Sequence, residues 1–159
     1  MEIDASRVGE QVNSLFGKGY FCSKITAIIL QDILGCPSDE VIKAMSSFSG
    51  GVGRNGTSCG ALNGALAVVG QLFGCGREGK DDPRLVEYIQ KVYNGFLKHA
   101  AKEYNSVNCR DIAGVDWWNP EEALSYFKSP EKINKCRQLI IATIAQTANI
   151  LKEAIADSK

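Results

Sequence analysis

Cysteine is the residue type of this chain with the clearest capacity for chemistry, and the sequence contains six of them. Four are predicted to lie at or near helix starts, namely Cys22, Cys59, Cys109 and Cys136. Backbone N–H groups at a helix start favour negative charge, so a thiolate is expected to form more easily there. The placement of these four thiols predicts redox chemistry or metal ligation.

The spacing of these cysteines limits the kinds of site that they can build. None belongs to a CxxC pair, so neither a thioredoxin motif nor a zinc ribbon is present. Thiols from four separate helices could form two disulfides, a structural metal site or an iron–sulfur cluster held by four thiolates. Four separate thiolates suit a four-ligand site better than a two-electron dithiol, which favours a metal ion or a cluster.

A glycine-rich loop precedes the second of these cysteines and formally contains the GxGxxG dinucleotide fingerprint. A predicted helix precedes the loop where the fingerprint needs a strand, and no following strand places an acidic residue near a ribose. The loop also lacks the lysine and hydroxyl of a phosphate-binding P-loop. We therefore predict no nucleotide cofactor, and expect instead a backbone nest that holds negative charge. Its candidate binding residues are Gly51, Gly53, Arg54, Gly56 and Gly60.

Other reactive groups are scarce. The only histidine, His99, is expected on the exposed surface of a helix, so Ser-His-Asp, Cys–His and multi-histidine metal sites are disfavoured. Two further interpretations stay open. One is an enzyme that acts through Cys59 alone with help from Arg54, and the other is a non-catalytic helical binding or interaction module whose cysteines are structural.

Helical periodicity of apolar residues extends along nearly the whole chain, without sustained strand-like alternation. We predict an all-α, compact single-domain bundle of roughly six to eight helices over residues 1–159. The expected helices cover residues 8–16, 21–34, 39–48, 59–73, 82–104, a short turn from 109, 119–127 and 130–156. Gly60, Gly64 and Ala67 share one helix face, so either another helix backbone or a cofactor is expected to approach closely there, with helix packing favoured.

Charge and composition indicate few kinds of partner. Lys plus Arg and Asp plus Glu both number 18, without a basic cluster, which argues against nucleic acid or an anionic membrane. The longest apolar runs, such as 25–30, are too short to span a bilayer. The acidic start lacks a secretory pattern, so a cytoplasmic location is expected. Surfaces for a homo-oligomer are offered by Trp117, Trp118 and the small-residue helix. The redox partner stays unknown.

Four short motifs follow one another in a familiar order. They are Gly19-Tyr20-Phe21-Cys22, a Gly-Gly-x-Gly-Arg loop leading to Cys59-Gly-Ala-x-x-Gly64, then Ser106-Val-Asn-Cys109-Arg-Asp, and finally Lys135-Cys136. Over about residues 7–150 the chain resembles the C_GCAxxG_C_C family of redox-active proteins, to which a domain of split-Soret cytochromes is related. The resemblance implies a compact helical fold and cysteines that act together in redox or metal chemistry.

The chain departs from the family pattern in two places. The pattern has Gly-Cys-Ala where this sequence has Ser58-Cys59-Gly60-Ala61, so the loop geometry is expected to differ. No Cys-x-x-Cys-His motif is present, so no covalent haem is predicted. Cys36 and Cys75 fall outside the pattern and are expected to be incidental.

The leading hypothesis is a redox or electron-transfer protein whose four remaining cysteines meet at one centre, with an iron–sulfur cluster or a metal ion as its cofactor.

Overall fold

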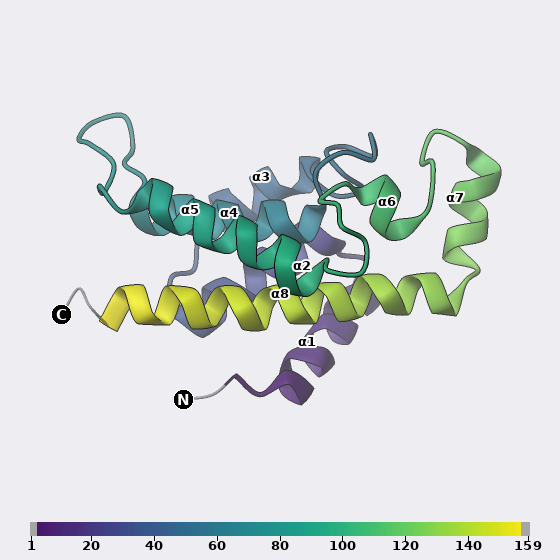
Figure 1. Ribbon diagram of the computed structural model, residues 1–159, viewed down its shortest axis with the longest axis horizontal. Coiled ribbons are helices and arrows are strands. Elements are labelled where there is room, and N and C mark those ends of the chain that lie inside the picture. The colour runs from purple at the N-terminus through teal and green to yellow at the C-terminus, as the bar shows by residue number, and fades with distance from the viewer. Residues whose placement is uncertain (1–2, 157–159) are drawn as a thin grey trace.

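The computed structural model describes residues 3–156 and is all-helical over that range, which confirms the predicted fold class (Figure 1). Its α-helices are α1 (Ala5–Gly17), α2 (Cys22–Leu34), α3 (Asp39–Ala44), α4 (Gly60–Phe73), α5 (Leu85–Gly95), α6 (Cys109–Ala113), α7 (Pro120–Phe127) and α8 (Pro130–Ala156). A 3₁₀ turn, η1 (Met45–Ser47), follows α3, and a π-helical turn, η2 (Phe96–Ala100), continues α5. Within the described range, β pairing is limited to an isolated bridge between Ser58 and Asn108.

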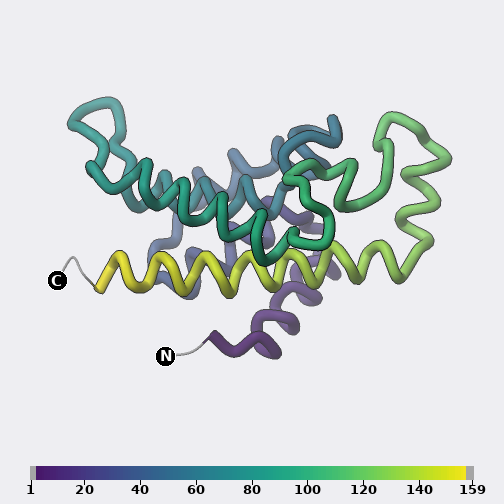
Figure 2. The backbone as a smooth tube through the Cα atoms, viewed as in Figure 1, coloured from purple at the N-terminus to yellow at the C-terminus, as the bar shows by residue number. Residues whose placement is uncertain are grey.

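The long helix α8 runs along the molecule, and all the other α-helices except α3 pack against it (Figures 1 and 2). Helices α1, α2, α4 and α5 all contact it, and Ile140, Ile144 and Leu151 are buried at these contacts. By length and composition alone, α8 could cross a bilayer. This was not anticipated from the sequence, because only uninterrupted apolar runs were considered there. Of its apolar window, 44% is buried inside the protein.

Helices α2 and α4 form the closest helix pair in the core, and glycines make that approach feasible. A Cβ atom added at Gly64 would overlap the carbonyl oxygen of Ser23, and one added at Gly60 would overlap the sulfur of Cys22. Both glycines are buried against α2. Helix packing therefore explains the small-residue face predicted from the sequence.

Three predicted helix boundaries, in two helices, were wrong. The helix expected from residue 82 begins at Leu85, because the Asp82 carboxylate accepts hydrogen bonds from the backbone and guanidinium of Arg84 and holds a turn before the helix. That helix also passes into the π-turn η2 before residue 104. The helix expected over 39–48 is α-helical only to Ala44, after which the chain tightens into η1.

Candidate functional site

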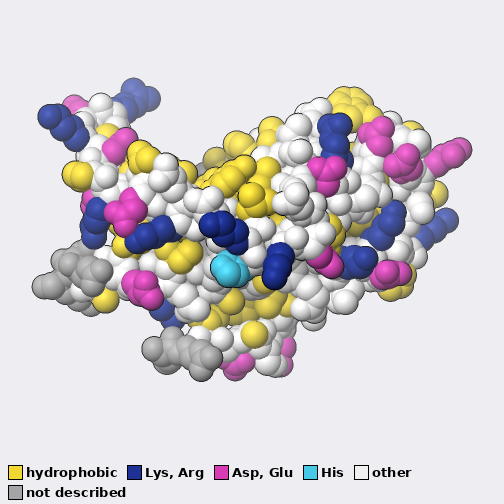
Figure 3. Space-filling view, viewed as in Figure 1, with side chains coloured by type: hydrophobic (Ala, Val, Ile, Leu, Met, Phe, Trp, Pro, Cys, Tyr) yellow, Lys and Arg dark blue, Asp and Glu magenta, His cyan; other side chains and the backbone are white. Residues whose placement is uncertain are grey.

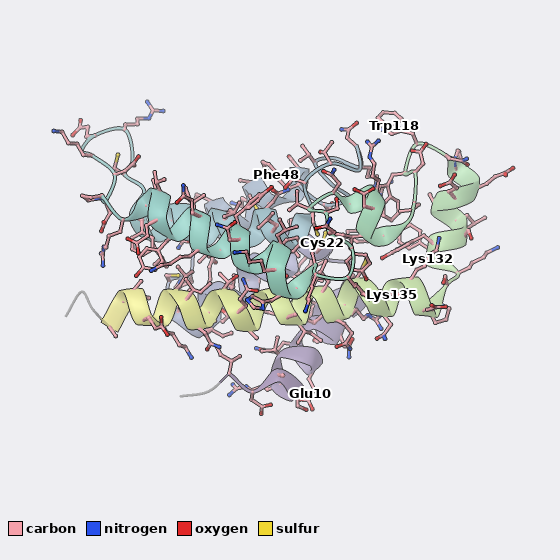
Figure 4. All side chains as sticks on the ribbon, in the orientation of Figure 1. Glu10, Cys22, Phe48, Trp118, Lys132 and Lys135 are labelled. Carbon is pink, nitrogen blue, oxygen red and sulfur yellow. The ribbon has the colours of Figure 1, made fainter. Side chains whose placement is uncertain are left out.

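A single cavity of about 380 Å³ is lined by all four cysteines singled out from the sequence. They are supplied by the first residue of α2 (Cys22), the residue that precedes α4 (Cys59), the first residue of α6 (Cys109) and the second turn of α8 (Cys136). In the view of Figure 4, the half-buried Cys22 lies between α8 and the helices drawn above it. Cys36 and Cys75 do not line this cavity. The structure thus brings four sulfurs from distant parts of the chain to one space.

Two loop segments hold Cys59 and Cys109 in place by pairing side by side. The backbone N–H of Cys59 donates to the carbonyl oxygen of Val107 at 2.8 Å, and the N–H of Cys109 donates to that of Thr57 at 2.7 Å. These bonds flank the isolated bridge. Because both cysteines are fixed by backbone hydrogen bonds, their positions do not depend on side-chain packing alone.

The glycine-rich loop adopts a left-handed conformation over five successive residues, from Gly50 through Arg54, with φ between 63° and 71°. Two of the five, Val52 and Arg54, are residues for which this conformation costs about 1 kcal/mol or more each. The curl places Gly50 and Arg54 on the cavity wall. A Cβ at Gly51 would lie 2.6 Å from the Cβ of Cys109, so the loop backbone packs directly behind that cysteine.

The five candidate binding residues of this loop and helix therefore have different environments. Arg54 and Gly60 line the cavity, whereas Gly51 lies behind Cys109. Gly53 and Gly56 do not line it, although Gly56 lines a neighbouring surface pocket.

Hydrogen-bond donors surround the four sulfurs. The indole N–H of Trp117 donates to the sulfur of Cys109 at 3.3 Å, and the Tyr126 hydroxyl hydrogen-bonds the sulfur of Cys136. Backbone N–H groups at the start of α2, at the start of α4 and in the glycine loop favour the thiolates of Cys22 and Cys59. Each of these contacts lowers the pKa of the thiol concerned, as donors to a thiolate do.

Burial nevertheless raises the pKa of all four thiols. The pKa of Cys59 is raised well above its ordinary value by burial and then by repulsion from Cys22 and Cys109. Burial likewise raises the pKa of Cys109 to about 11. The prediction that the helix starts yield easily formed thiolates was therefore wrong for this structure, because the desolvation of charge outweighs the N–H groups.

The rest of the cavity wall is apolar and aromatic. Trp117 and Tyr126 pack edge to face with ring centroids 4.9 Å apart, and Phe21 and Phe127 keep 42% and 49% of their surface exposed. Apolar and aromatic lining residues are Phe16, Phe21, Ile112, Ala113, Trp117, Tyr126, Phe127, Ile133, Leu139 and Ile140. Such a wall limits the access of water to the sulfurs.

Sequence reasoning missed several polar groups of this site, among them Tyr126 and Arg137. Arg137 follows Cys136 directly, and Ile133, Cys136, Arg137 and Ile140 recur at the three- and four-residue spacing of one helix face. That periodicity could have placed the arginine beside the sulfur, whereas no local signal connects Tyr126 with the cysteines. The only histidine, His99, is exposed as predicted and lies on the molecular surface (Figure 3).

Comparison with known proteins adds one decisive observation. The model of the C_GCAxxG_C_C family, described as a putative redox-active protein, matches residues 20–150. The chain belongs to this family. The match includes all four cavity cysteines and the glycine loop, and it begins after α1, later than the limit of about residue 7 expected from the motifs. A search of curated proteins and a search of solved structures each found no match.

The cavity offers the types of donor that bind an iron–sulfur cluster, although the described side chains are not arranged as a metal site. Four thiols line it together with N–H and O–H donors to sulfur, which is how proteins bind and tune such clusters. Over residues 3–156, no group of three or more His, Cys, Asp or Glu side chains is arranged so that it could hold a metal ion. Metal ligation by the four cysteines therefore stays a prediction.

Proposed function

We propose that this redox-family chain is an electron-transfer or redox protein in which Cys22, Cys59, Cys109 and Cys136 together hold an iron–sulfur cluster. The observation that supports this most directly is that these four thiols, from four separate elements, line one cavity. The other two cysteines line no part of it. Thiolates are the usual ligands of such clusters, which undergo electron transfer when bound.

The size of the cavity favours a cluster over a single ion. About 380 Å³ corresponds to the volume of roughly thirteen water molecules in the liquid. A single zinc ion needs four sulfurs at about 2.3 Å from one point, which leaves almost no space between them. A cluster of several iron and sulfide ions is the larger group that a space of this size would accommodate.

Electrostatics supports the same proposal. Burial and mutual repulsion keep the thiols protonated, while the surrounding donors favour the thiolates. Positively charged iron would reverse the balance by compensating the buried negative charge, so binding should release protons. The donors that remain on sulfur, Trp117 on Cys109 and Tyr126 on Cys136, would then orient the ligands and tune the potential.

The test is anaerobic reconstitution of the full chain with ferrous iron and sulfide. Iron and sulfide are counted per chain, and absorption and electron paramagnetic resonance spectra are recorded before and after reduction. Serine variants of the four cavity cysteines are compared with Cys36→Ser and Cys75→Ser, which change the same atom outside the cavity. We expect the first four to lose most of the bound iron and the two controls to retain it.

Three results would contradict the proposal. The first is a wild-type chain that takes up no iron and sulfide, the second is an equal loss of iron in the control variants, and the third is uptake of zinc alone. If the four serine variants also kept full stability without any bound metal, the cysteines would be structural parts of a binding module instead.

A further inference from the structure

Among residues 3–156, two arginines are the only charged residues that line the cavity. Arg54, which is also exposed to solvent, comes from the left-handed loop, and Arg137, which is half-buried, comes from α8. Neither forms an ion pair within residues 3–156, and no Asp or Glu of that range lines the cavity. The wall therefore carries two positive charges that the described protein groups do not balance.

Arg137 is held in a way that leaves its charge uncompensated. Its guanidinium carbon lies 5.2 Å from the ring centroid of Phe16, a cation–π contact that fixes the group without supplying negative charge. Its Nε atom is buried and has no hydrogen-bond partner. Arg137 as a whole is half-buried, but a buried N–H without an acceptor is unfavourable, so an acceptor at Nε would complete this part of the wall.

The surroundings of the two arginines match a small organic ligand better than an inorganic ion. The cavity volume of about 380 Å³ lies within the range of about 300–1,000 Å³ typical of small-molecule sites. Its wall is mostly aromatic and aliphatic with a few polar groups, among them Asn13. Phe21 and Phe127 are half exposed and line the same space, so the cavity opens to the surface between apolar side chains.

We propose that this cavity binds a small organic acid beside the cysteines. Its anionic group lies against Arg54 and Arg137, and its apolar body lies along Phe16, Phe21 and Phe127. The binding site itself is inferred from the charges and shape of the cavity. The further inference, that this acid belongs to the substrate class of the cysteine centre, rests on the proposed function.

Benzoate is a suitable probe, and benzamide is its neutral counterpart of nearly the same shape. Calorimetric titration of the full chain, with and without iron reconstitution, is expected to show benzoate binding at least 10-fold more tightly than benzamide. Arg137→Gln and Arg54→Gln should each weaken benzoate binding roughly 10-fold or more while leaving benzamide binding unchanged. Arg77→Gln removes the same charge from an exposed position outside the cavity and should leave benzoate binding unchanged.

The outcomes separate this site from the cluster proposal. Equal binding of benzoate and benzamide to the wild-type chain overturns the acid site, and this comparison needs no variant to fold. The acid site is also overturned if Arg77→Gln weakens benzoate binding as much as the two cavity variants do, since binding would then reflect net charge. If wild-type chain binds no benzoate and Arg137→Gln loses iron, the arginines serve the cluster, so the acid site fails and the proposed function stands. Selective benzoate binding to a chain that takes up no iron supports the acid site while the proposed function fails.

Discussion

Replacing Gly64 by alanine tests whether the backbone contact between α2 and α4 positions the cysteine cavity. The new Cβ would overlap the carbonyl oxygen of Ser23 and lie 3.0 Å from the Cβ of Thr26. The carbonyl belongs to the backbone of α2, so it cannot move away without moving the helix. Restoring an ordinary contact requires the two helices to separate by roughly 1 Å, which forfeits a quarter to a half of the dispersion energy across the opened gap.

The expected free-energy change follows from two opposing terms. Alanine in place of glycine inside a helix stabilises by about 1 kcal/mol, whereas overpacking a core contact costs about 1–3 kcal/mol, and more where the backbone must shift. Gly64→Ala should therefore lower the free energy of unfolding by about 2 kcal/mol. Gly70→Ala is the matched control in the same helix, because nothing lies within 4 Å of its added Cβ, and it should raise that free energy by up to about 1 kcal/mol.

Urea unfolding followed by circular dichroism measures both variants, with the slope against denaturant as a check that the unfolded states are comparable. The difference of about 3 kcal/mol corresponds to roughly 6–12 °C in Tm for a chain of this size. Since Cys22 begins α2 and Cys59 precedes α4, Gly64→Ala should also reduce iron uptake, whereas Gly70→Ala should not. Equal stability of the two variants would refute the proposed close helix contact.

Three further predictions test the buried hydroxyls, the glycine loop and the thiol titration. Thr147→Val should raise the unfolding free energy by up to about 1 kcal/mol, because the buried Thr147 hydroxyl has no hydrogen-bond partner. Thr143→Val should lower it by about 1 kcal/mol, because the Thr143 hydroxyl donates to a backbone carbonyl at 2.7 Å. Urea unfolding of both variants tests this, and the opposite order of stability contradicts the reasoning. Gly51→Ala should lower the unfolding free energy by about 3 kcal/mol and Gly53→Ala by about 1 kcal/mol. Both glycines have positive φ, but only an alanine at position 51 would crowd the Cβ of Cys109. Similar thermal unfolding of the two variants would argue against that crowding. Burial raises the pKa of Cys109 from 9.0 to about 11, so the unfolded chain loses its proton first, and the stability contributed by this thiol, present below pH 9, is lost as the pH rises to 11. Before iron is added, unfolding free energies should fall over that interval by up to about 3 kcal/mol more than in Cys109→Ser, and parallel pH profiles would exclude this role.

The sequence predicted the helical fold and the close helix pair because both depend on local patterns. Apolar residues repeat at the helical period, and two glycines four residues apart on one face permit a close approach wherever a partner helix lies. Gly60 and Gly64 indeed face α2. The four cysteines were selected for similar reasons, through their positions near helix starts and their place in the family motif.

The titration behaviour of the thiols could not be predicted from the same patterns, because burial is a property of the tertiary structure. The helix-start argument correctly identified donors near Cys22 and Cys59, but it could not see that apolar groups from other helices surround the sulfurs. Tyr126 was missed for a related reason, because its helix, α7, reaches the cavity only through the fold. Arg137 differs, because it follows Cys136 in α8 and the helical period could have placed it in the site.

The left-handed loop is the other feature that local reasoning could not supply. Glycines permit this conformation, but Val52 and Arg54 disfavour it, so no propensity argument predicts five such residues in a row. The conformation persists because hydrogen bonds fix the loop. Within it the N–H of Gly56 donates to the carbonyl oxygen of Gly50, and from α6 the N–H of Arg110 donates to the carbonyl oxygen of Gly56.

The glycines of the cysteine motifs have a common physical role, which replaces the nucleotide interpretation of the GxGxxG match. A side chain at Gly60 would overlap the sulfur of Cys22, and one at Gly51 would crowd the Cβ of Cys109. In both places the backbone contacts a cysteine of another segment at a distance that only glycine allows. The glycine loop and the start of α4 therefore make room for two sulfurs at once. A substitution at either glycine should displace a thiol from the cavity, and for that reason the glycines act as part of the cysteine site although neither could bind a cofactor through a side chain.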